Sequence, residues 1–410
     1  MLYAFGVAAF ALAILISVSL HEAGHMITAK RFGMKVTRYF VGFGPTLWSF
    51  RRGETEYGIK AIPLGGFCKI VGMTPQDDDV DPADEPRAMW RFPLWKRTVV
   101  MSAGSVTHFL LAIVAVWLTA IFIGLPNQEL NKPQPAYIKT TDCVVVQPVS
   151  RECGAGDPPS PARQAGLRDD DKITAINGVP VATYSDLVNE VRKLPPNSQA
   201  TINYERDGAA QQTNVTLGAV ERPPVDKPDG QVTTVAALGV AGSLPPGMPL
   251  RIKSNPVEAF GATADYTGQL AVNTVQALQR LPQKVPALFS AISGEPRDAD
   301  TPISVVGASR LGGEAVQHGL WDLFVMLFIG LNFFIGVFNL LPLLPLDGGH
   351  IAIAFFERIR SWFAARLGRP DPGHVDYFKL MPVTYAIILI GGAFTLLTIT
   401  ADIVNPITLF

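Results

Sequence analysis

The sequence predicts a polytopic α-helical membrane protein with four transmembrane helices, a membrane-associated β-hairpin element and a water-soluble α+β domain. Three observations support this fold class. Charged residues make up only 17% of the 410 residues, whereas a soluble globular protein has about 25%. The mean hydropathy is +0.24. Apolar runs long enough to cross a bilayer recur along the chain, with a long polar segment between the second and the third.

Composition also excludes several classes of protein. The chain carries 34 Lys and Arg residues against 35 Asp and Glu residues, which gives a net charge of -1. A general nucleic-acid-binding protein with a basic face is therefore not expected. Three cysteines are too few for a fold held together by disulfides.

The four predicted spans contain no Asp, Glu, Lys or Arg. They run from about 2 to 20, 98 to 125, 323 to 346 and 380 to 399. A cleaved signal peptide is the alternative for the first run, but no basic segment precedes it and its apolar stretch is too long. The short segments after spans one and three are rich in Lys and Arg, which favours the cytoplasm for both. The long segment 126–319 is then expected outside the cell.

A metal-binding motif, His21-Glu22-Ala23-Gly24-His25, follows the first apolar run directly. On a helix, positions i and i+4 share a face, so both imidazoles can bind one metal ion. Glu22 lies beside them and can take a proton from a metal-bound water. Ionisable groups at this depth in a membrane are costly and are usually functional. The alternative is that the two histidines only mark the membrane interface.

The segment that follows is rich in glycine and aromatic residues. Its alternating pattern over residues 46–60, around Gly53, predicts a β-hairpin. Taken alone, the pattern is equally typical of an ordinary cytoplasmic hairpin.

The outer segment alternates signals of strands and short helices. An Asn-Gly turn predicts a hairpin over residues 171–181. Residues 183–193 predict an amphipathic helix capped by Thr183 or Ser185. Farther along, residues 255–293 predict a second amphipathic helix, with breaks at Pro282 and Pro286. Cys143 and Cys153 fall in this segment and can pair in an oxidising compartment.

A third metal ligand must come from elsewhere, because catalytic zinc usually has three protein ligands and one open position. Asp347 is the candidate: spans one and three run in the same direction, so its depth at the end of span three matches that of the histidine pair. Pro342 and Pro345 should unwind the helix end. Gly348 and Gly349 allow tight backbone geometry beside the metal. The alternative is that Asp347 only caps a helix end.

Two asparagines lie in the otherwise apolar third span. Asn339 can hydrogen-bond a tetrahedral oxyanion or hold the substrate backbone, or it can make a helix–helix hydrogen bond; the sequence favours neither. Asn332 fits a helix–helix hydrogen bond better.

These motifs resemble the site-2 protease family of intramembrane zinc metalloproteases, in its PDZ-containing bacterial branch. The chain is most similar to the actinobacterial, mycobacterial-type members, over nearly its whole length. The motifs that carry the resemblance are HEAGH at 21–25, VGFGP at 41–45, RRGETEYGIKAIPLGGF at 51–67, GM at 72–73, TPISVVGAS at 301–309 and NLLPLLPLDGGH at 339–350.

The resemblance implies an activity and a site. It implies an intramembrane zinc endopeptidase in which His21, His25 and Asp347 hold Zn2+ and the catalytic Glu22 assists the attack of zinc-bound water. It implies regulated intramembrane proteolysis of membrane-anchored, single-span substrates of the anti-sigma-factor type, already trimmed by an upstream site-1-type protease. It implies a multi-pass protein of the cell's inner (plasma) membrane, with the lipid bilayer as its surroundings and no nucleic acid among its partners.

In this family the region after HEAGH is a β-element that re-enters the membrane and offers an edge strand to the substrate. A helical substrate must be unwound before a metal can reach its peptide bond, and an edge strand supplies replacement hydrogen bonds. Gly65, Gly66 and Phe67 are the expected clamping residues. The outer domain resembles an extracytoplasmic PDZ domain, which either binds an extended peptide or acts as a bulk filter that keeps intact ectodomains away.

Two departures from the family pattern affect which residue roles can be transferred from the family to this chain. The second proline before the aspartate stands one place later than in many members, at Pro345. Ala103-Gly104-Ser105 with His108 stands where many members have Ala-Gly-Pro followed by Asn. His108 is therefore expected to be a packed, hydrogen-bonded residue, or alternatively a donor that orients a metal ligand.

The expected organisation divides the chain into eight parts. These are helix 1 with HExxH (1–27), a cytoplasmic segment with the re-entrant β-element (28–97), helix 2 (98–125), the PDZ-like domain (126–225), a linker with amphipathic helices (226–319), helix 3 with the Asp-Gly motif (320–350), a cytoplasmic loop (351–378), and helix 4 with the tail (379–410).

Two other functions remain as alternatives. The chain could be a catalytically silent PDZ membrane scaffold that sequesters partners. It could also be a metal transporter, which the sequence disfavours because a ligand cluster at one face gives no relay of ionisable groups across the bilayer.

Overall fold

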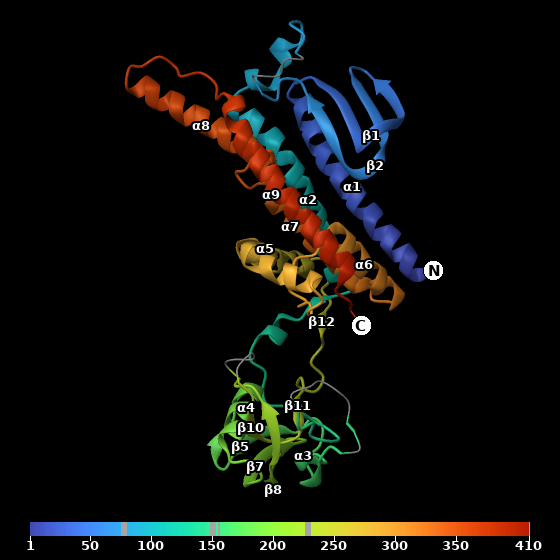
Figure 1. Ribbon diagram of the computed structural model, residues 1–410, viewed down its shortest axis with the longest axis vertical. Helices are drawn as coiled ribbons and strands as arrows, with labels where there is room; N and C mark the ends of the chain where they lie inside the picture. Colours follow the sequence, from blue (N-terminus) through green and yellow to red (C-terminus); the bar gives the residue numbers. More distant parts are fainter. Residues whose placement is uncertain (75–79, 148–152, 155, 226–230, 410) are drawn as a thin grey trace. The chain divides into compact units, whose positions relative to one another are not determined.

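The computed structural model, shown in Figure 1, describes residues 1–74, 80–147, 153–154, 156–225 and 231–409. The chain forms two compact units. Unit 1 combines Met1–Leu125 with Lys253–Phe410 and contains the long helices. Unit 2 is Pro126–Ile252 and contains short strands and helices. Part of the predicted linker, residues 226–230, lies outside the described residues.

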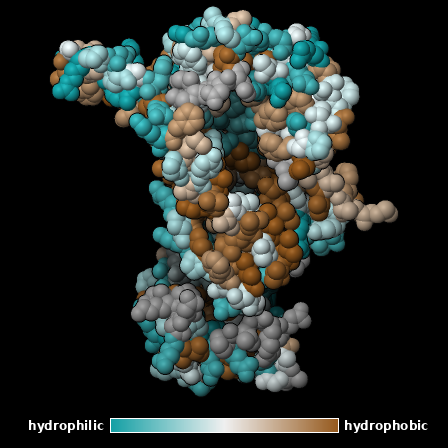
Figure 2. All heavy atoms as spheres, turned by 45° about the horizontal axis from the view of Figure 1, so that its top comes forward, coloured by the Kyte–Doolittle hydropathy of each residue, from teal (hydrophilic) through white to brown (hydrophobic). Residues whose placement is uncertain are grey.

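Four helices of the described chain are long and apolar enough to cross a membrane, and each coincides with a predicted span. They are α1 (Leu2–Arg31), α2 (Leu94–Phe122), α7 (Trp321–Asn339) and α9 (Tyr377–Val404). Figure 2 shows hydrophobic residues gathered in the middle of the visible face of the molecule. α1 continues past the predicted span to Arg31, because most of the added residues, such as Glu22, Ala29 and Lys30, are good helix formers. α7 ends earlier than predicted, at Asn339, because Pro342 and Pro345 have no backbone N–H to continue the helix.

The predicted hairpin over residues 46–60 is larger than expected. β1 (Val36–Arg52) and β2 (Thr55–Ile70) pair antiparallel with several register shifts. The first half of β1, near Phe40, pairs with residues 56–59 on one side and with 66–70 on the other. Among the described strands, nothing pairs with the outer side of 66–70, which is therefore an edge strand. The Tyr39 hydroxyl donates a hydrogen bond of 2.7 Å to the Ser19 carbonyl and so attaches the sheet to α1.

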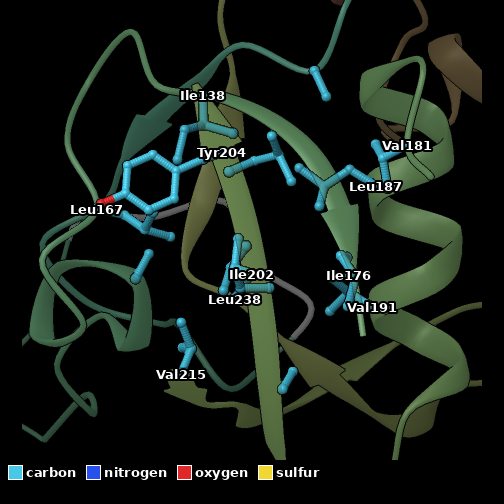
Figure 3. Packing of buried hydrophobic residues seen from close by; sticks show 14 of the residues in the cluster. Ile138, Leu167, Ile176, Val181, Leu187, Val191, Ile202, Tyr204, Val215 and Leu238 are labelled. Carbon is cyan, nitrogen blue, oxygen red and sulfur yellow. The ribbon is translucent and has the colours of Figure 1, made fainter. Parts of the chain in front are cut away.

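Unit 2 is built around a four-stranded antiparallel sheet in the order β6-β5-β7-β8. Its strands are β5 (Lys172–Ile176), β6 (Val179–Pro180), β7 (Gln199–Arg206) and β8 (Ala209–Thr216). Figure 3 shows buried side chains such as Ile202 and Leu187 filling the space between this sheet and α4 (Tyr184–Lys193). The Asn177-Gly178 turn joins β5 to β6 as predicted.

Smaller elements complete unit 2. The remaining strands are β3 (Leu125–Pro126, which begins in unit 1), β4 (Ile138–Thr140), β9 (Gly218–Arg222), β10 (Thr233–Ala237), β11 (Val240–Gly242) and β12 (Arg251–Ile252). The remaining helices are α3 (Pro161–Gln164) and the short 3-10 helix η3 (Gln128–Asn131). The prediction of a cap for α4 is confirmed at Thr183, which forms a capping box with Asp186. Cys143 and Cys153 form a disulfide.

Three further α-helices belong to unit 1: α5 (Glu258–Ile292), α6 (Val305–Gln317) and α8 (Asp347–Arg366); two short 3-10 helices, η1 (Glu85–Arg87) and η2 (Met89–Arg91), precede α2. The predicted breaks in α5 are wrong, because the helix continues through both Pro282 and Pro286. Each proline removes a single backbone donor, and the turns on either side keep their hydrogen bonds. α6 packs closely on α1, where a Cβ atom on Gly312 would lie 2.8 Å from the Phe10 ring.

Candidate metal centre

One face of α1 supplies two of the predicted metal ligands. Residues at a spacing of three or four along this helix are buried: Phe10, Ile14, Ser17, His21, His25 and Ala29. His21 is 6% exposed and His25 is 5% exposed. Because i and i+4 side chains lie on the same face of a helix, the two imidazoles approach each other, and their Nε2 atoms are 3.2 Å apart.

The structure brings Asp347 to this histidine pair. Its Oδ2 atom lies 3.4 Å from Nε2 of His21 and 3.3 Å from Nε2 of His25. A tetrahedral zinc ion with bonds of about 2.0–2.1 Å has ligands about 3.3–3.4 Å from one another. The three donor atoms therefore form one face of a tetrahedron of the size that zinc requires. Asp347 Oδ2 is buried and accepts no hydrogen bond from the described residues, so it remains available to a metal ion.

The ring orientation of His25 suits metal binding through Nε2. Its Nδ1 atom lies 2.7 Å from the backbone carbonyl of Val100 in α2. A carbonyl only accepts hydrogen bonds, so Nδ1 carries the proton and Nε2 keeps its lone pair for a metal. Nδ1 of His21 is buried without a hydrogen-bond partner among the described residues.

Glycines let the helices and the aspartate loop approach the site. A Cβ atom on Gly104 of α2 would lie 2.4 Å from Cε1 of His21 and 2.5 Å from Nε2 of His25. A Cβ atom on Gly348 would lie 2.3 Å from the Leu340 carbonyl oxygen. Any larger residue at either position would push α2, or the loop before α8, away from the donors.

Glu22 lies between the donor cluster and the β-sheet. A Cβ atom on Gly66 of β2 would lie 3.4 Å from Cγ of Glu22. The backbone N–H of Cys68 donates a hydrogen bond to the Glu22 carboxylate. The carboxylate is therefore held beside the edge strand 66–70, close to both histidines.

The other predicted site residues have different surroundings. Gly66 and Phe67 pair with Val41 and Phe40 of β1, and the Phe67 ring stacks on the Phe40 ring at 5.5 Å. Gly65 has φ +134°, a conformation that favours glycine. Asn339 is the last residue of α7, is partly exposed and makes no side-chain hydrogen bond to the described residues. Its amide is thus not engaged by the other described residues.

A buried polar cluster next to the site joins three helices. Nδ1 of His108 lies 2.9 Å from Oδ1 of Asn332 and 3.1 Å from the Ser17 hydroxyl, which also donates to Asn332. The His108 and His21 rings are 5.0 Å apart. The expectation of a helix–helix hydrogen bond at Asn332 is confirmed, and His108 is packed and hydrogen-bonded.

Sequence reasoning missed two residues of the site. Ser17 is one helical turn before His21 on the same face of α1, and that spacing is the signal that could have indicated it. Gly104 was noted only for its place in a motif. Its contact with both histidines depends on how α2 packs on α1, which the sequence does not specify.

The comparisons with known proteins agree with this geometry. The pattern of a family described as "Peptidase family M50" matches residues 9–367. The zinc metalloprotease Rip1 of Mycolicibacterium smegmatis is 45% identical over 415 residues, and the alignment covers 100% of each chain. Rip1 of Mycobacterium tuberculosis is 46% identical over 413 residues, again with full coverage of both.

A more distant relative and one solved structure are also similar. A putative zinc metalloprotease of Nostoc sp. is 29% identical over 406 residues, which cover 97% of this chain and 95% of the relative. A solution structure from Geobacillus thermodenitrificans aligns with 23% of this chain and 90% of its own, at 25% identity. Its TM-score of 0.14 is too low to bear on the fold.

Proposed function

The chain belongs to peptidase family M50, the site-2 protease family of zinc metalloendopeptidases, and on that premise we propose that it cleaves single-span membrane proteins within or beside their membrane helix. It is a multi-pass membrane protein whose surroundings are the lipid bilayer. The observation that carries the proposal is the triangle of donor atoms formed by His21, His25 and Asp347, with sides of 3.2, 3.3 and 3.4 Å.

The proposed chemistry assigns a role to each residue of the cluster. His21, His25 and Asp347 hold zinc, which supplies Lewis-acid chemistry by polarising a water molecule and the scissile carbonyl. Glu22 takes a proton from the attacking water and later gives it to the leaving amine. Burial of the two imidazoles keeps bulk water from competing for the site.

The edge strand beside Glu22 is the proposed substrate platform. A peptide in a transmembrane helix has all its backbone groups hydrogen-bonded, and unwinding it in a membrane leaves them without partners. No described strand pairs with the outer side of strand 66–70, so its backbone groups there, other than the Cys68 N–H that donates to Glu22, can pair with a substrate. A substrate segment that pairs there passes next to the Glu22 carboxylate, because Gly66 lies against Cγ of that residue. Gly65, Gly66 and Phe67 clamp this segment.

Asn339 is proposed to position the reacting carbonyl. Its amide is partly exposed at the end of α7, and α8 begins with Asp347 after a short loop. An amide N–H at this place can donate to the oxygen that becomes negatively charged in the transition state.

The substrates we propose are of the anti-sigma-factor type, shortened beforehand by a site-1-type protease. The relatives named Rip1 are zinc metalloproteases of bacteria, and the four apolar helices support a membrane setting. We place the protein in the inner (plasma) membrane with residues 126–225, as a PDZ-like domain, on the extracytoplasmic side. The antiparallel sheet of unit 2 and the capped helix α4 are compatible with that domain type. The domain then admits trimmed substrates and keeps intact ectodomains away.

The test uses the purified full-length protein in lipid with a single-span anti-sigma-type substrate that lacks its outer domain. Wild type should cut within the substrate's span, and mass spectrometry should locate the bond. Glu22→Gln should lower the rate by about 100-fold to 10,000-fold. Glu205→Gln, which removes a partly exposed carboxylate from unit 2, is the matched control and should leave the rate unchanged.

A zinc chelator should also stop cleavage, and zinc should restore it. Cleavage that is unaffected by Glu22→Gln would overturn the proposed role of this residue. A folded, zinc-loaded protein that cleaves none of a panel of such substrates would instead support the scaffold alternative.

A further inference from the structure

Helix α8 has one face that no described part of the chain covers. The apolar side chains on this face are Phe355, Phe356, Ile359, Trp362 and Phe363, each between 45% and 55% exposed. At 100° per residue these positions fall within one arc of the helix. The residues that are buried, among them Ala354 and Glu357, lie on the side that packs against the rest of unit 1.

The charged side chains of α8 are also distributed unevenly, because its acidic side chains are largely buried and its other charged residues are arginines. Its acidic residues, Asp347 and Glu357, both have side chains at most 16% exposed. Four arginines occur in or just after the helix: Arg358, Arg360, Arg366 and Arg369. Arg358 and Arg360 lie on opposite borders of the apolar arc. Arg366 covers the Trp362 ring at 4.9 Å, and Arg360 covers the Phe356 ring at 5.7 Å.

We propose that α8 lies in the membrane surface, with its aromatic face among the acyl chains and its arginines bound to anionic lipid headgroups. An apolar aromatic face bordered by arginines is the pattern of helices that bind anionic interfaces. The chain connections agree, because α7 ends shortly before α8 and α9 begins shortly after it, and both are membrane-spanning candidates. In Figure 1, α8 projects away from these helices.

The position of α8 also affects the proposed catalytic site, and this part of the inference rests on the proposed function. Asp347 is the first residue of α8. Farther along, Glu357 accepts a hydrogen bond from Arg97 of α2 at 3.4 Å, and both side chains are at most 10% exposed. α2 also carries Val100 and Gly104, which contact the histidines. A membrane surface that fixes the tilt of α8 therefore fixes Asp347 relative to the two imidazoles.

The first test measures where α8 lies, without using activity. Ile359→Cys is spin-labelled in a Cys68→Ser background, and the full chain is placed in vesicles of phosphatidylcholine and phosphatidylglycerol in equal amounts. The label should be accessible to oxygen in the lipid and several-fold less accessible to an aqueous nickel complex. A label at Ala365, which is exposed but lies outside the apolar arc, is the matched control and should remain accessible to nickel.

Two outcomes would overturn the interfacial position. One is equal access of nickel to both labels, which would place the apolar face in water. The other is a label at position 359 shielded from both oxygen and nickel, which would mean that a protein, such as a second copy of this chain, covers the face.

The second test concerns the arginines. Arg358, Arg366 and Arg369 make no hydrogen bond or ion pair with other described side chains, so a triple change to Gln is expected to keep the fold and to remove only the contact of Arg366 with the Trp362 ring. Because each basic residue near an anionic surface contributes about a fivefold preference, wild type should cleave substrate several-fold faster in these vesicles than in phosphatidylcholine alone. The triple variant should lose that difference. The matched control is Arg163→Gln, Arg168→Gln and Lys193→Gln in unit 2, which should keep it.

The two tests distinguish this proposal from the proposed function. If the label at position 359 is in the lipid but no lipid mixture supports cleavage, the proposed function fails and the interfacial helix stands. If the triple variant keeps the full lipid response, the headgroup contact by these arginines is wrong, whatever the protein cleaves.

Discussion

Gly104 of α2 lies so close to His21 of α1 that a Cβ atom at position 104 would be 2.4 Å from Cε1 of the imidazole. The second helix therefore has no room for a side chain where it passes the metal centre. Gly24 of α1 is confined in the same way, because its Cβ atom would lie 2.7 Å from the Ala103 carbonyl. Close approach of two helices at small residues is a common packing mode in membranes.

Replacing Gly104 should therefore disturb the metal site before it disturbs the rest of the fold. Gly104→Ala should reduce the zinc that copurifies with the protein to a small fraction of one equivalent per chain, because the added methyl group displaces both imidazoles. Gly330→Ala in α7 is the control, since nothing lies within 4 Å of a Cβ atom there. Elemental analysis of the two purified variants makes the comparison. Full zinc occupancy in Gly104→Ala would show that the contact has no role.

The two asparagines of α7 should behave differently. Asn332 is 1% exposed and accepts the Ser17 hydrogen bond, so Asn332→Leu should lower the free energy of unfolding by about 1–2 kcal/mol. Asn339 makes no such bond, so Asn339→Leu should leave stability unchanged and lower the cleavage rate by about a hundredfold. Thermal unfolding in detergent and substrate cleavage, measured on both variants, test this. Equal effects on stability would contradict the assignment of Asn339 to substrate positioning.

A buried ion pair joins the end of α9 to Arg297, in the segment between α5 and α6. Arg297 Nη2 lies 2.9 Å from Asp402 Oδ1, and both side chains are 1% exposed. Oδ2 of Asp402 accepts hydrogen bonds from the backbone N–H groups of Ser304 and Gly307. Asp402→Ala should lower the free energy of unfolding by about 3–5 kcal/mol, because it leaves a buried guanidinium without its partner.

The double variant Arg297→Met with Asp402→Leu checks the cause of this loss. It should be more stable than Asp402→Ala alone, since no unpaired buried charge remains. Unfolding midpoints in a single detergent provide the measurement. The two single variants, Arg297→Met and Asp402→Leu, complete the comparison. If the loss of unfolding free energy in the double variant equals the sum of their losses, the residues do not act as a pair.

The capping box of α4 should make this helix sensitive to acid. Hydrogen bonds from the Thr183 hydroxyl and backbone N–H lower the pKa of Asp186 from its ordinary value of 3.8. A lowered pKa in the folded state means that the stabilisation is complete above pH 3.8 and is lost as the pH falls below it. Hydrogen exchange of α4 amides, corrected for intrinsic rates, should show this loss in wild type. Asp186→Asn should be less protected at neutral pH and should change little on acidification.

Much of this structure could be predicted from local sequence patterns. The four spans follow from long uncharged runs, and the shared face of His21 and His25 follows from helical spacing. Two prolines after Asn339 explain why α7 ends there. The predicted span continued to Leu346, so the sequence indicated the cause of the helix end but not its position. These features depend on a few neighbouring residues, so one sequence is sufficient to indicate them.

Several features that depend on contacts between distant segments were missed, although the meeting of Asp347 with the histidine pair was expected. The cluster of Ser17, His108 and Asn332 requires three helices in one register, and no single helix pattern specifies that register. The double pairing of β1 depends on glycines such as Gly58, where a Cβ atom would lie 2.5 Å from the Phe40 ring. A proline locally disfavours the interior of a helix, yet α5 continues through Pro282. The local sequence alone was therefore not sufficient to predict where this helix ends.

The most direct test of the central claim is the zinc content of the purified protein in a series of variants. The account predicts about one zinc ion per chain in wild type and in Glu22→Gln, because Glu22 moves protons and does not hold the metal. It predicts almost none in the variant that combines His21→Ala, His25→Ala and Asp347→Ala. Stoichiometric zinc in that triple variant would contradict the account, because the metal would then be bound elsewhere.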